Sequence, residues 1–204
     1  MGCRLWRIEL GYVEGSFVMV VYGLIAATLV ALVGVVWLYN LLVRKWQMVN
    51  NGWADIDVQL KRRSDLVPRL VDAVSGYAAH ERNLFEDIAE KRGLAENAGE
   101  DPARRAEAES ALARPVAQLL ALAEAYPDLK ASGSFSGLQQ ELVETENKIE
   151  MARRFYNGAV RELNTAVQSF PTSLVAPVIG FSPRTYFEID SAPDRAAPQV
   201  ALKP

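Results

Sequence analysis

The sequence is poor in the residues from which most active sites and metal sites are built. It contains one cysteine, Cys3, and one histidine, His80, in 204 residues. Zinc needs about three to four ligands, so neither a structural nor a catalytic zinc site is expected, whereas carboxylate sites for magnesium or calcium stay open. Glycine-rich phosphate loops, nucleophile elbows and paired-histidine motifs are missing as well. The sequence therefore predicts a protein that is not an enzyme and has no cofactor and no small-molecule substrate.

A surplus of charge is also lacking. Lysine and arginine total 22 and aspartate and glutamate 25, which gives a formal net charge of −3. Basic residues do not form a stripe interleaved with aromatic residues, so we expect no nucleic-acid partner. Cys3 has no second cysteine to pair with and leaves the redox compartment open. His80, next to Glu81, is interpreted as a partly exposed helix residue.

A long uncharged run is present near the N-terminus, from Gly15 to Val43. It exceeds the roughly 20 residues that a helix needs to cross the hydrocarbon of a bilayer. A cleaved signal peptide is the alternative, but its apolar region is shorter and is followed by a small-residue cleavage site. The residues that end this run are aromatic and cationic, as is typical of a retained membrane helix. They are Trp37, Tyr39, Arg44, Lys45 and Trp46.

Two further features of the run bear on its behaviour in a membrane. Five cations follow it closely and only two, Arg4 and Arg7, precede it, which favours a cytoplasmic C-terminal domain. Gly23, Ala27 and Ala31 recur four apart and place small residues on one stripe of the helix. Such a stripe permits close association of two spanning helices.

After the run, apolar residues recur alternately three and four positions apart. This spacing predicts an amphipathic helix with a coiled-coil-like seam that ends near Gly93. Because of Pro68, the helix should bend there or restart after Ser64 or Asp65. The seam comprises Trp46, Val49, Trp53, Ile56, Leu60, Val67, Leu70, Val74, Tyr77, Leu84 and Ile88. Asp101 and Pro102 predict the start of a second helix, in which Pro115 should produce a bend.

A third helix is expected from about Leu138 to Phe170, ended by Pro171. Short connections require the three helices to be antiparallel. The predicted fold is therefore all-α, with one N-terminal transmembrane helix followed by an antiparallel bundle of long helices. The predicted domains are a short tail (1–16), the transmembrane helix (17–43), the bundle (44–170), and an irregular apolar segment with a disordered C-terminal tail (171–204).

Two polar runs lie on or beside the expected seam. Arg63 occupies a seam position between Leu60 and Val67, where a buried polar group needs a partner and can fix helix register. We predict that Arg63 or Arg153 pairs with a glutamate of the third helix such as Glu141, Glu144 or Glu146; a solvated face of two helices is the alternative. The candidate registry residues are Gln59, Arg63, Asp65, Glu146, Asn147, Arg153, Tyr156 and Asn157.

Long ordered stretches of the chain resemble the LemA family of bacterial membrane proteins. The resemblance runs from about Tyr39 to Phe187. It is carried by YNLLVRKWQMV (39–49), WADIDVQLKRRSDLVPRLVDAVSGYAAHE (53–81), EAYPDLKAS (124–132), FSGLQQELVETENKIEMARRFYN (135–157), FPTSL (170–174), and the Gly180–Phe181 pair. The segment from about Glu96 to Ala106 and a longer N-terminal tail depart from the family pattern.

The resemblance implies a single-pass protein of the bacterial inner membrane with a helical bundle and no established enzymatic activity. The first hypothesis is a non-enzymatic interaction or scaffold protein. The resemblance suggests that such a protein serves as an adaptor for another membrane protein, such as a membrane metalloprotease. A self-assembling structural or membrane-remodelling protein is the alternative, and an enzyme with an unrecognised site comes third. The expected partners are the lipid membrane and a second copy of the chain, another membrane protein, or both.

Overall fold

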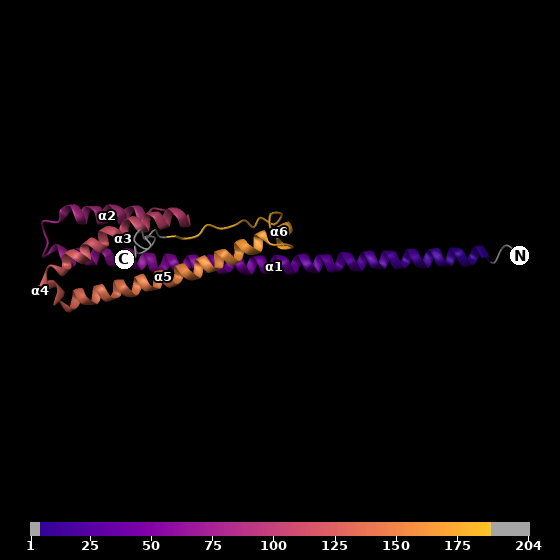
Figure 1. The fold of residues 1–204 in the computed structure, drawn as a ribbon, viewed down its shortest axis with the longest axis horizontal. Helices are drawn as coiled ribbons and strands as arrows, with labels where there is room; N and C mark the ends of the chain where they lie inside the picture. The colour runs from indigo at the N-terminus through magenta and orange to yellow at the C-terminus, as the bar shows by residue number, and fades with distance from the viewer. Residues whose placement is uncertain (1–4, 189–204) are drawn as a thin grey trace, which may run out of the picture. The chain divides into compact units, whose positions relative to one another are not determined.

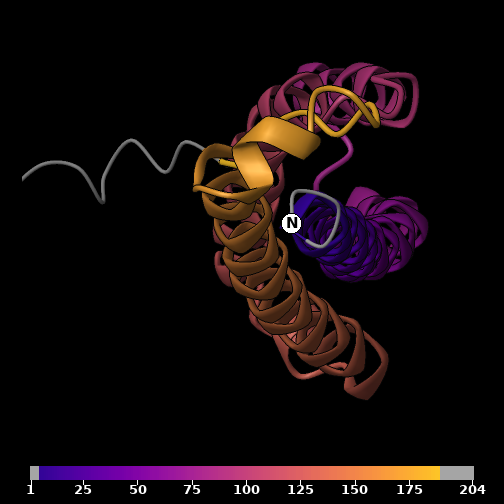
Figure 2. The ribbon, with the colours of Figure 1, turned by 90° about the vertical axis from the view of Figure 1, so that its right-hand side faces the viewer.

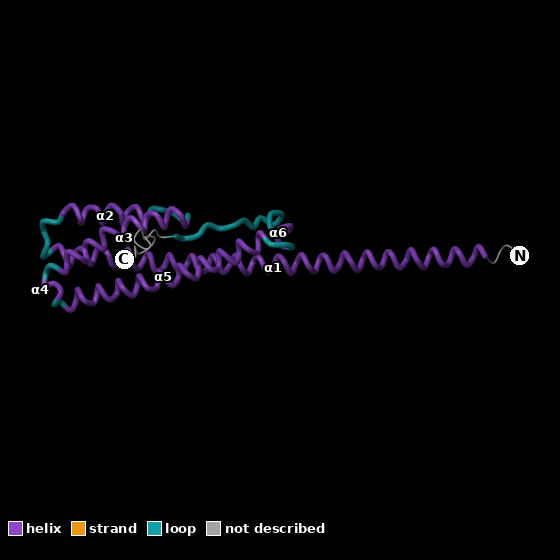
Figure 3. The backbone as a smooth tube through the Cα atoms, in the orientation of Figure 1, coloured by secondary structure: helices purple, strands orange, loops and turns teal. Residues whose placement is uncertain are grey.

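All regular structure in the part of the chain that is described is helical. The computed structural model describes the backbone of residues 5–188 and the side chains of residues 18–188. The helices are α1 (Leu5–Ser75), α2 (Arg82–Glu96), α3 (Pro102–Glu124), α4 (Pro127–Lys130), α5 (Gly133–Gln168) and α6 (Thr172–Val175), coloured along the chain in Figure 1 and by type in Figure 3. The prediction of an all-α protein with a long N-terminal apolar helix is confirmed.

The chain forms two compact units. Of the described residues, the N-terminal unit comprises residues 5–45 together with Thr165–Ser182. The bundle unit comprises Trp46–Asn164 together with residues 183–188. Helix α1 contributes to both, because the seam that begins at Trp46 continues the helix of the apolar run without interruption.

In the bundle unit, α1, α2, α3 and α5 alternate in direction along the chain (Figure 1). Figure 2, turned by 90°, looks along the length of α1 and shows α5 at a slant to it. The apolar faces of the four helices share a core, as the predicted three- and four-residue spacing requires. Its members include Leu70, Ile88, Leu112, Leu119, Phe135 and Leu142. Further fully buried side chains of the bundle unit are Ile56, Leu60, Ile149, Tyr156 and Leu163.

The prediction that the first amphipathic helix ends near Gly93 is wrong. Helix α1 ends at Ser75, and a turn that contains Gly76 and exposed His80 separates it from α2. The amide groups of Tyr77 and Ala78 both donate to the Val74 carbonyl, which closes the helix end. Because the chain folds back, Ile88 of α2 packs in the shared core. In a continued helix, Ile88 would have no core to pack against. The bundle therefore has four helices where the spacing predicted three.

Pro68 neither ends nor restarts α1, contrary to a restart after Ser64. Proline has no N–H, so the carbonyl four residues earlier loses its helical hydrogen bond. That carbonyl belongs to Ser64, and the Arg92 Nε of α2 donates to it at 2.9 Å. A bend at Pro68 or Pro115 stays a prediction, and α3 also runs through its proline.

The predicted start of the next helix is confirmed. Asp101 caps α3, its carboxylate accepting from the amides of Ala103 at 2.8 Å and Arg104 at 3.2 Å, and Pro102 is the first helical residue. These contacts satisfy amide groups that have no partner within the helix. At the other end of the bundle, α5 starts at Gly133, five residues before the predicted start, and ends at Gln168, shortly before Pro171.

Residues 183–188 cross the bundle unit in an extended conformation (Figure 3). Asn157 holds this strand-like segment by both backbone groups of Phe187, donating to its carbonyl at 3.0 Å and accepting from its amide at 2.9 Å. The Tyr156 hydroxyl donates to the Thr185 carbonyl at 2.9 Å. Phe187 is fully buried, with its ring edge against Trp53. Residues 183–188 thus pack on the bundle, while the predicted disordered C-terminal tail, SAPDRAAPQVALKP, lies outside the described residues.

Gly52 of α1 marks a close approach to α5. A Cβ atom built on Gly52 would lie 3.1 Å from the Tyr156 Cα and 3.0 Å from the Phe155 Cδ1. Gly158 of α5 is also helical, but a Cβ there would meet nothing within 4 Å. We expect Gly158→Ala to raise the free energy of unfolding by about 0.5–1 kcal/mol through helix propensity alone.

The same change at Gly52 should lower the free energy of unfolding by about 1–2 kcal/mol, because the helix backbones must separate. The measurement is chemical denaturation of the full chain in detergent, followed by circular dichroism. Equal stabilisation by Gly52→Ala and Gly158→Ala would contradict the close approach.

Candidate functional site

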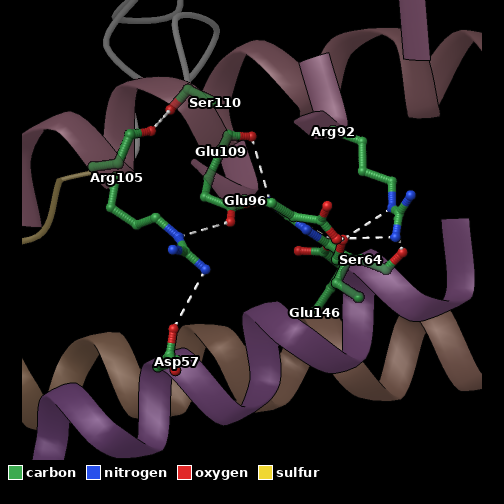
Figure 4. Close-up of polar contacts among 10 residues, drawn as sticks. Asp57, Ser64, Arg92, Glu96, Arg105, Glu109, Ser110 and Glu146 are labelled. Atoms are coloured by element: carbon green, nitrogen blue, oxygen red, sulfur yellow. Dashed lines mark hydrogen bonds and ion pairs between the residues drawn. The ribbon is translucent and has the colours of Figure 1, made fainter. Parts of the chain in front are cut away.

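The bundle unit contains two bonded groups of charged and polar side chains, which meet at the chain neighbours Arg63 and Ser64 and which we together call the polar layer. Its members come from all four long helices: Asp57, Arg63 and Ser64 of α1, Arg92 and Glu96 of α2, Arg105 and Glu109 of α3, and Glu146 of α5. Most of these side chains are drawn and labelled in Figure 4. The polar layer interrupts an otherwise apolar core.

Arg63 lies at the centre of the polar layer and is 3% exposed. Its Nη1 donates to the Glu146 carboxylate at 3.0 Å, and its Nη2 donates to the Glu109 carboxylate and to the Glu109 carbonyl, the latter at 3.4 Å. Burial disfavours the charged guanidinium, but the attraction of Glu146 and Glu109 outweighs it, so the pKa of Arg63 is raised. Arg63 is therefore a permanent cation that joins α1, α3 and α5.

Glu109 is held from a second side. Its side chain is 4% exposed and also accepts from the Arg105 Nε at 3.2 Å. Arg105 in turn reaches the Asp57 carboxylate of α1 at 3.3 Å, as Figure 4 shows. The buried carboxylate thus has two arginine partners, which is the condition for a buried ion to be tolerated.

The α2 side of the polar layer is formed by Arg92, Ser64 and Glu96. The Arg92 Nε donates to the Ser64 hydroxyl at 3.0 Å, and the Ser64 hydroxyl donates to the Glu96 carboxylate at 2.7 Å. Arg92 also pairs with Glu96 at 2.9 Å. In Figure 4 Arg92 points toward Ser64 on α1, so this cluster fixes α2 to the helix from which it folds back.

Two buried polar atoms of the polar layer region have no hydrogen-bond partner among the described residues. They are the Arg63 Nε and the Gln59 Oε1. A cavity of about 200 Å³ lies beside Arg63 and Glu146 and is otherwise lined by Ala113, Val116, Ala117, Leu120 and Leu142. Its lining is mainly small and apolar, so it offers an ion pair at one side and no group arranged for chemistry.

No group of three or more histidine, cysteine, aspartate or glutamate side chains able to hold a metal ion occurs among the described residues. The carboxylates of the polar layer face arginines, which compete with any cation. The polar layer can fix the register of the helices and determine which helix packs against which. It does not present a nucleophile beside a base.

The structure places the predicted registry residues in several surroundings. Arg63 and Glu146 form the cross-bundle pair, and Tyr156 and Asn157 hold the extended segment. Gln59 is half-buried. The others lie outside the polar layer: Asp65 pairs with Lys61 on the surface, Asn147 is exposed, and Arg153 has no ion pair among the described residues. Their role in fixing register stays a prediction.

The predicted membrane residues all lie on α1. Gly23, Ala27 and Ala31 are exposed within the chain, as are Trp37 and Tyr39. Arg44 bonds the Asn40 carbonyl at 3.4 Å, Lys45 is half-buried, and Trp46 lies under the Arg184 guanidinium at 5.9 Å. Helix α1 is the one described helix that is long and apolar enough to cross a membrane, and its most apolar stretch is not buried in the protein.

Glu109 was missed in the sequence, although a signal for it exists. Leu112, Val116 and Leu119 define the apolar phase of α3, and Glu109 lies three residues before Leu112 on the same face. A charge in core phase on α3 could therefore have been matched with Arg63. Asp57, Ser64, Arg92, Glu96 and Arg105 carried no such signal, because they lie at the margins of their helices' buried faces.

A helix that is long and apolar enough to cross a membrane, followed by an antiparallel helical bundle with a buried ion network, defines the class of protein. The sequence profile of the LemA family matches residues 52–202, which is most of the chain. The chain belongs to the LemA family.

The similar proteins of known name agree with this assignment. The chain is 23% identical over 181 residues to the magnetosome protein MamQ of Magnetospirillum gryphiswaldense, covering 76% of this chain and 66% of MamQ. It is 28% identical over 137 residues to the protein LemA of Metamycoplasma hominis, covering 67% of this chain and 63% of that protein. The matched part thus spans just under two thirds of the relatives' own length.

Proposed function

We propose that this LemA-type protein is a non-enzymatic interaction or scaffold protein, anchored in the bacterial inner membrane by α1, that serves as an adaptor for another membrane protein or for copies of itself. The observation that carries the proposal is an exposed apolar stripe on α5. Val143, Met151 and Phe155 are 58%, 61% and 48% exposed and recur in steps of four or eight residues. Residues four apart share one helix face, so these side chains lie on one face of α5, with exposed Asn147 between Val143 and Met151.

The buried charges support the same proposal. The polar layer uses its arginines and carboxylates to bind one another. The charged side chains near the core therefore hold the helices together. The exposed face of α5 is then available to a partner.

The test is gentle extraction of the full chain in mild detergent, with the particle mass measured and companions identified. We expect a particle larger than one chain, and we expect Met151→Glu to reduce it, since a charge in an apolar contact is costly. Glu150→Gln, next to Met151 and half exposed, is the matched control and should leave the particle unchanged. A wild-type particle of one chain without a stoichiometric companion would reject the proposal.

Self-assembly into a structural or membrane-remodelling array is the second candidate. It is favoured by the Gly23, Ala27 and Ala31 stripe, at which close helix contact is possible. Many copies per particle, reduced by Ala27→Leu and not by Met151→Glu, would favour this candidate over the adaptor.

The proposed orientation places the bundle in the cytoplasm. Five cations follow the apolar run, against Arg4 and Arg7 before it, and positive residues are retained on the cytoplasmic side. A reporter enzyme that works only in the cytoplasm should be active when it is fused after Pro204. Activity of a reporter that works only in the periplasm would reverse the orientation and leave the anchor in place.

A further inference from the structure

A second uncharged stretch lies between α5 and the extended segment. No charged residue occurs between Glu162 and Arg184. We call residues 163–183 the uncharged segment. Three of its large side chains, Phe170, Leu174 and Val178, are 80%, 68% and 84% exposed and follow one another at intervals of four. Strong exposure of several large aromatic and aliphatic side chains within one short segment marks a surface that something covers.

The greater part of the uncharged segment, Thr165–Ser182, packs in the N-terminal unit against the end of the apolar run. The Phe181 ring meets Tyr39 of α1 edge-on, with 6.3 Å between ring centres. In the same unit Leu42 is fully buried and Leu38 nearly so, while Trp37, one residue before, stays exposed. The uncharged segment thus lies beside the helix where its apolar run ends, which is the depth at which tryptophan and tyrosine mark a bilayer surface.

The backbone of the uncharged segment is already hydrogen-bonded within the protein. Amides at seven positions donate to carbonyls of the segment: those of Ser173, Leu174, Ala176, Val178, Ile179, Gly180 and Phe181. Pro171 and Pro177 have no amide hydrogen to satisfy, and the Thr172 hydroxyl bonds the carbonyl of Ser169 at 2.8 Å near the end of α5. A backbone with few open groups can leave water at little cost.

We propose that the uncharged segment is a second membrane contact, which lies in the boundary between lipid headgroups and acyl chains with Phe170, Leu174 and Val178 inserted. The proposal rests on the proposed anchor, because the depth is set by the apolar run of α1. Charge is absent from the segment; Arg184 follows it directly, and Arg44 follows the apolar run of α1, as expected where a protein leaves a bilayer surface. The bundle would then be fixed to the membrane at two points.

The test uses the full chain in vesicles of phosphatidylcholine and phosphatidylglycerol, with Cys3→Ser as the background. Single cysteines at Leu174 or Val178 carry a nitroxide label, and spin-label saturation compares access by oxygen, which concentrates in lipid, with access by a water-soluble nickel chelate. Val30 in the apolar run, 73% exposed, is the lipid reference, and Val58 of α1, 62% exposed in the bundle unit, is the water reference. We expect Leu174 and Val178 to shift toward oxygen relative to Val58.

Each alternative outcome contradicts a different part of the proposal. Labels at Leu174 and Val178 that match Val58 while Val30 stays in lipid would overturn the second contact alone. A Val30 label open to the nickel chelate would overturn the anchor, and the second contact with it. Exclusion of both reagents at Val178 with broadening between labels would show that a second copy covers the segment, and would overturn the lipid proposal.

Discussion

Replacing Arg63 by alanine is expected to lower the free energy of unfolding by about 3 kcal/mol or more. The change leaves the Glu109 carboxylate buried with only Arg105 as a cationic partner and opens space next to the existing cavity. An unpaired buried ion costs more than its pair contributes, because desolvation is no longer offset. Denaturation of the full chain in detergent, followed by circular dichroism, measures the loss.

The neighbouring arginine is the matched control for this prediction. Arg62 is half exposed and lies 3.8 Å from Glu141, so Arg62→Ala should change the stability by about 0.5 kcal/mol or less. Equal, small effects of Arg62→Ala and Arg63→Ala would contradict the buried pair.

A double change separates stability from register. Arg63→Leu with Glu109→Leu removes both buried charges and supplies apolar side chains, and such replacements are often neutral or stabilising. We expect the double variant to recover most of the stability lost in Arg63→Ala. If the polar layer fixes register, the recovered protein should show looser packing, measured as faster hydrogen exchange of the bundle amides at similar overall stability. Slow exchange as in the wild type would remove the support for a registry role.

The second large effect is expected at Phe187. Its ring is fully buried against Trp53, and truncation of a buried phenylalanine to alanine costs about 3–5 kcal/mol. The extended segment can detach without unfolding the helices, so the loss should appear as detachment of residues 183–188. A loss of about 3 kcal/mol corresponds to a roughly hundredfold larger open population. We therefore expect trypsin to cleave after Arg184 about a hundredfold faster in Phe187→Ala, at low protease concentration.

Tyr186 provides the control for Phe187. It is the preceding residue and 39% exposed, so Tyr186→Ala should increase the cleavage only slightly. A second check is Asn157→Ala, which removes both hydrogen bonds to the Phe187 backbone and should also speed cleavage. Unchanged cleavage in Phe187→Ala would show that the extended segment is held by other contacts.

Local patterns in the sequence were sufficient for several features. Asp101 and Pro102 predicted the α3 start, since capping depends on residues within one turn. The uncharged run predicted an exposed apolar helix, because its length alone exceeds a bilayer's thickness. Burial of Arg63 followed from its phase among apolar residues.

The tertiary structure decided the rest, because each remaining feature depends on residues far apart in the chain. The turn after Ser75 could not be predicted from the spacing, because Leu84 and Ile88 continue the apolar pattern across it. Only the packing of α2 against other helices shows that the chain folds back. Glu109, the partner of Arg63, is 46 residues away in the chain. Arg92 of α2 donates to the Ser64 carbonyl and so replaces the helical hydrogen bond that Pro68 cannot make. Spacing determines which face of a helix is buried, whereas the partner of each buried charge is determined by how the helices are arranged around one another.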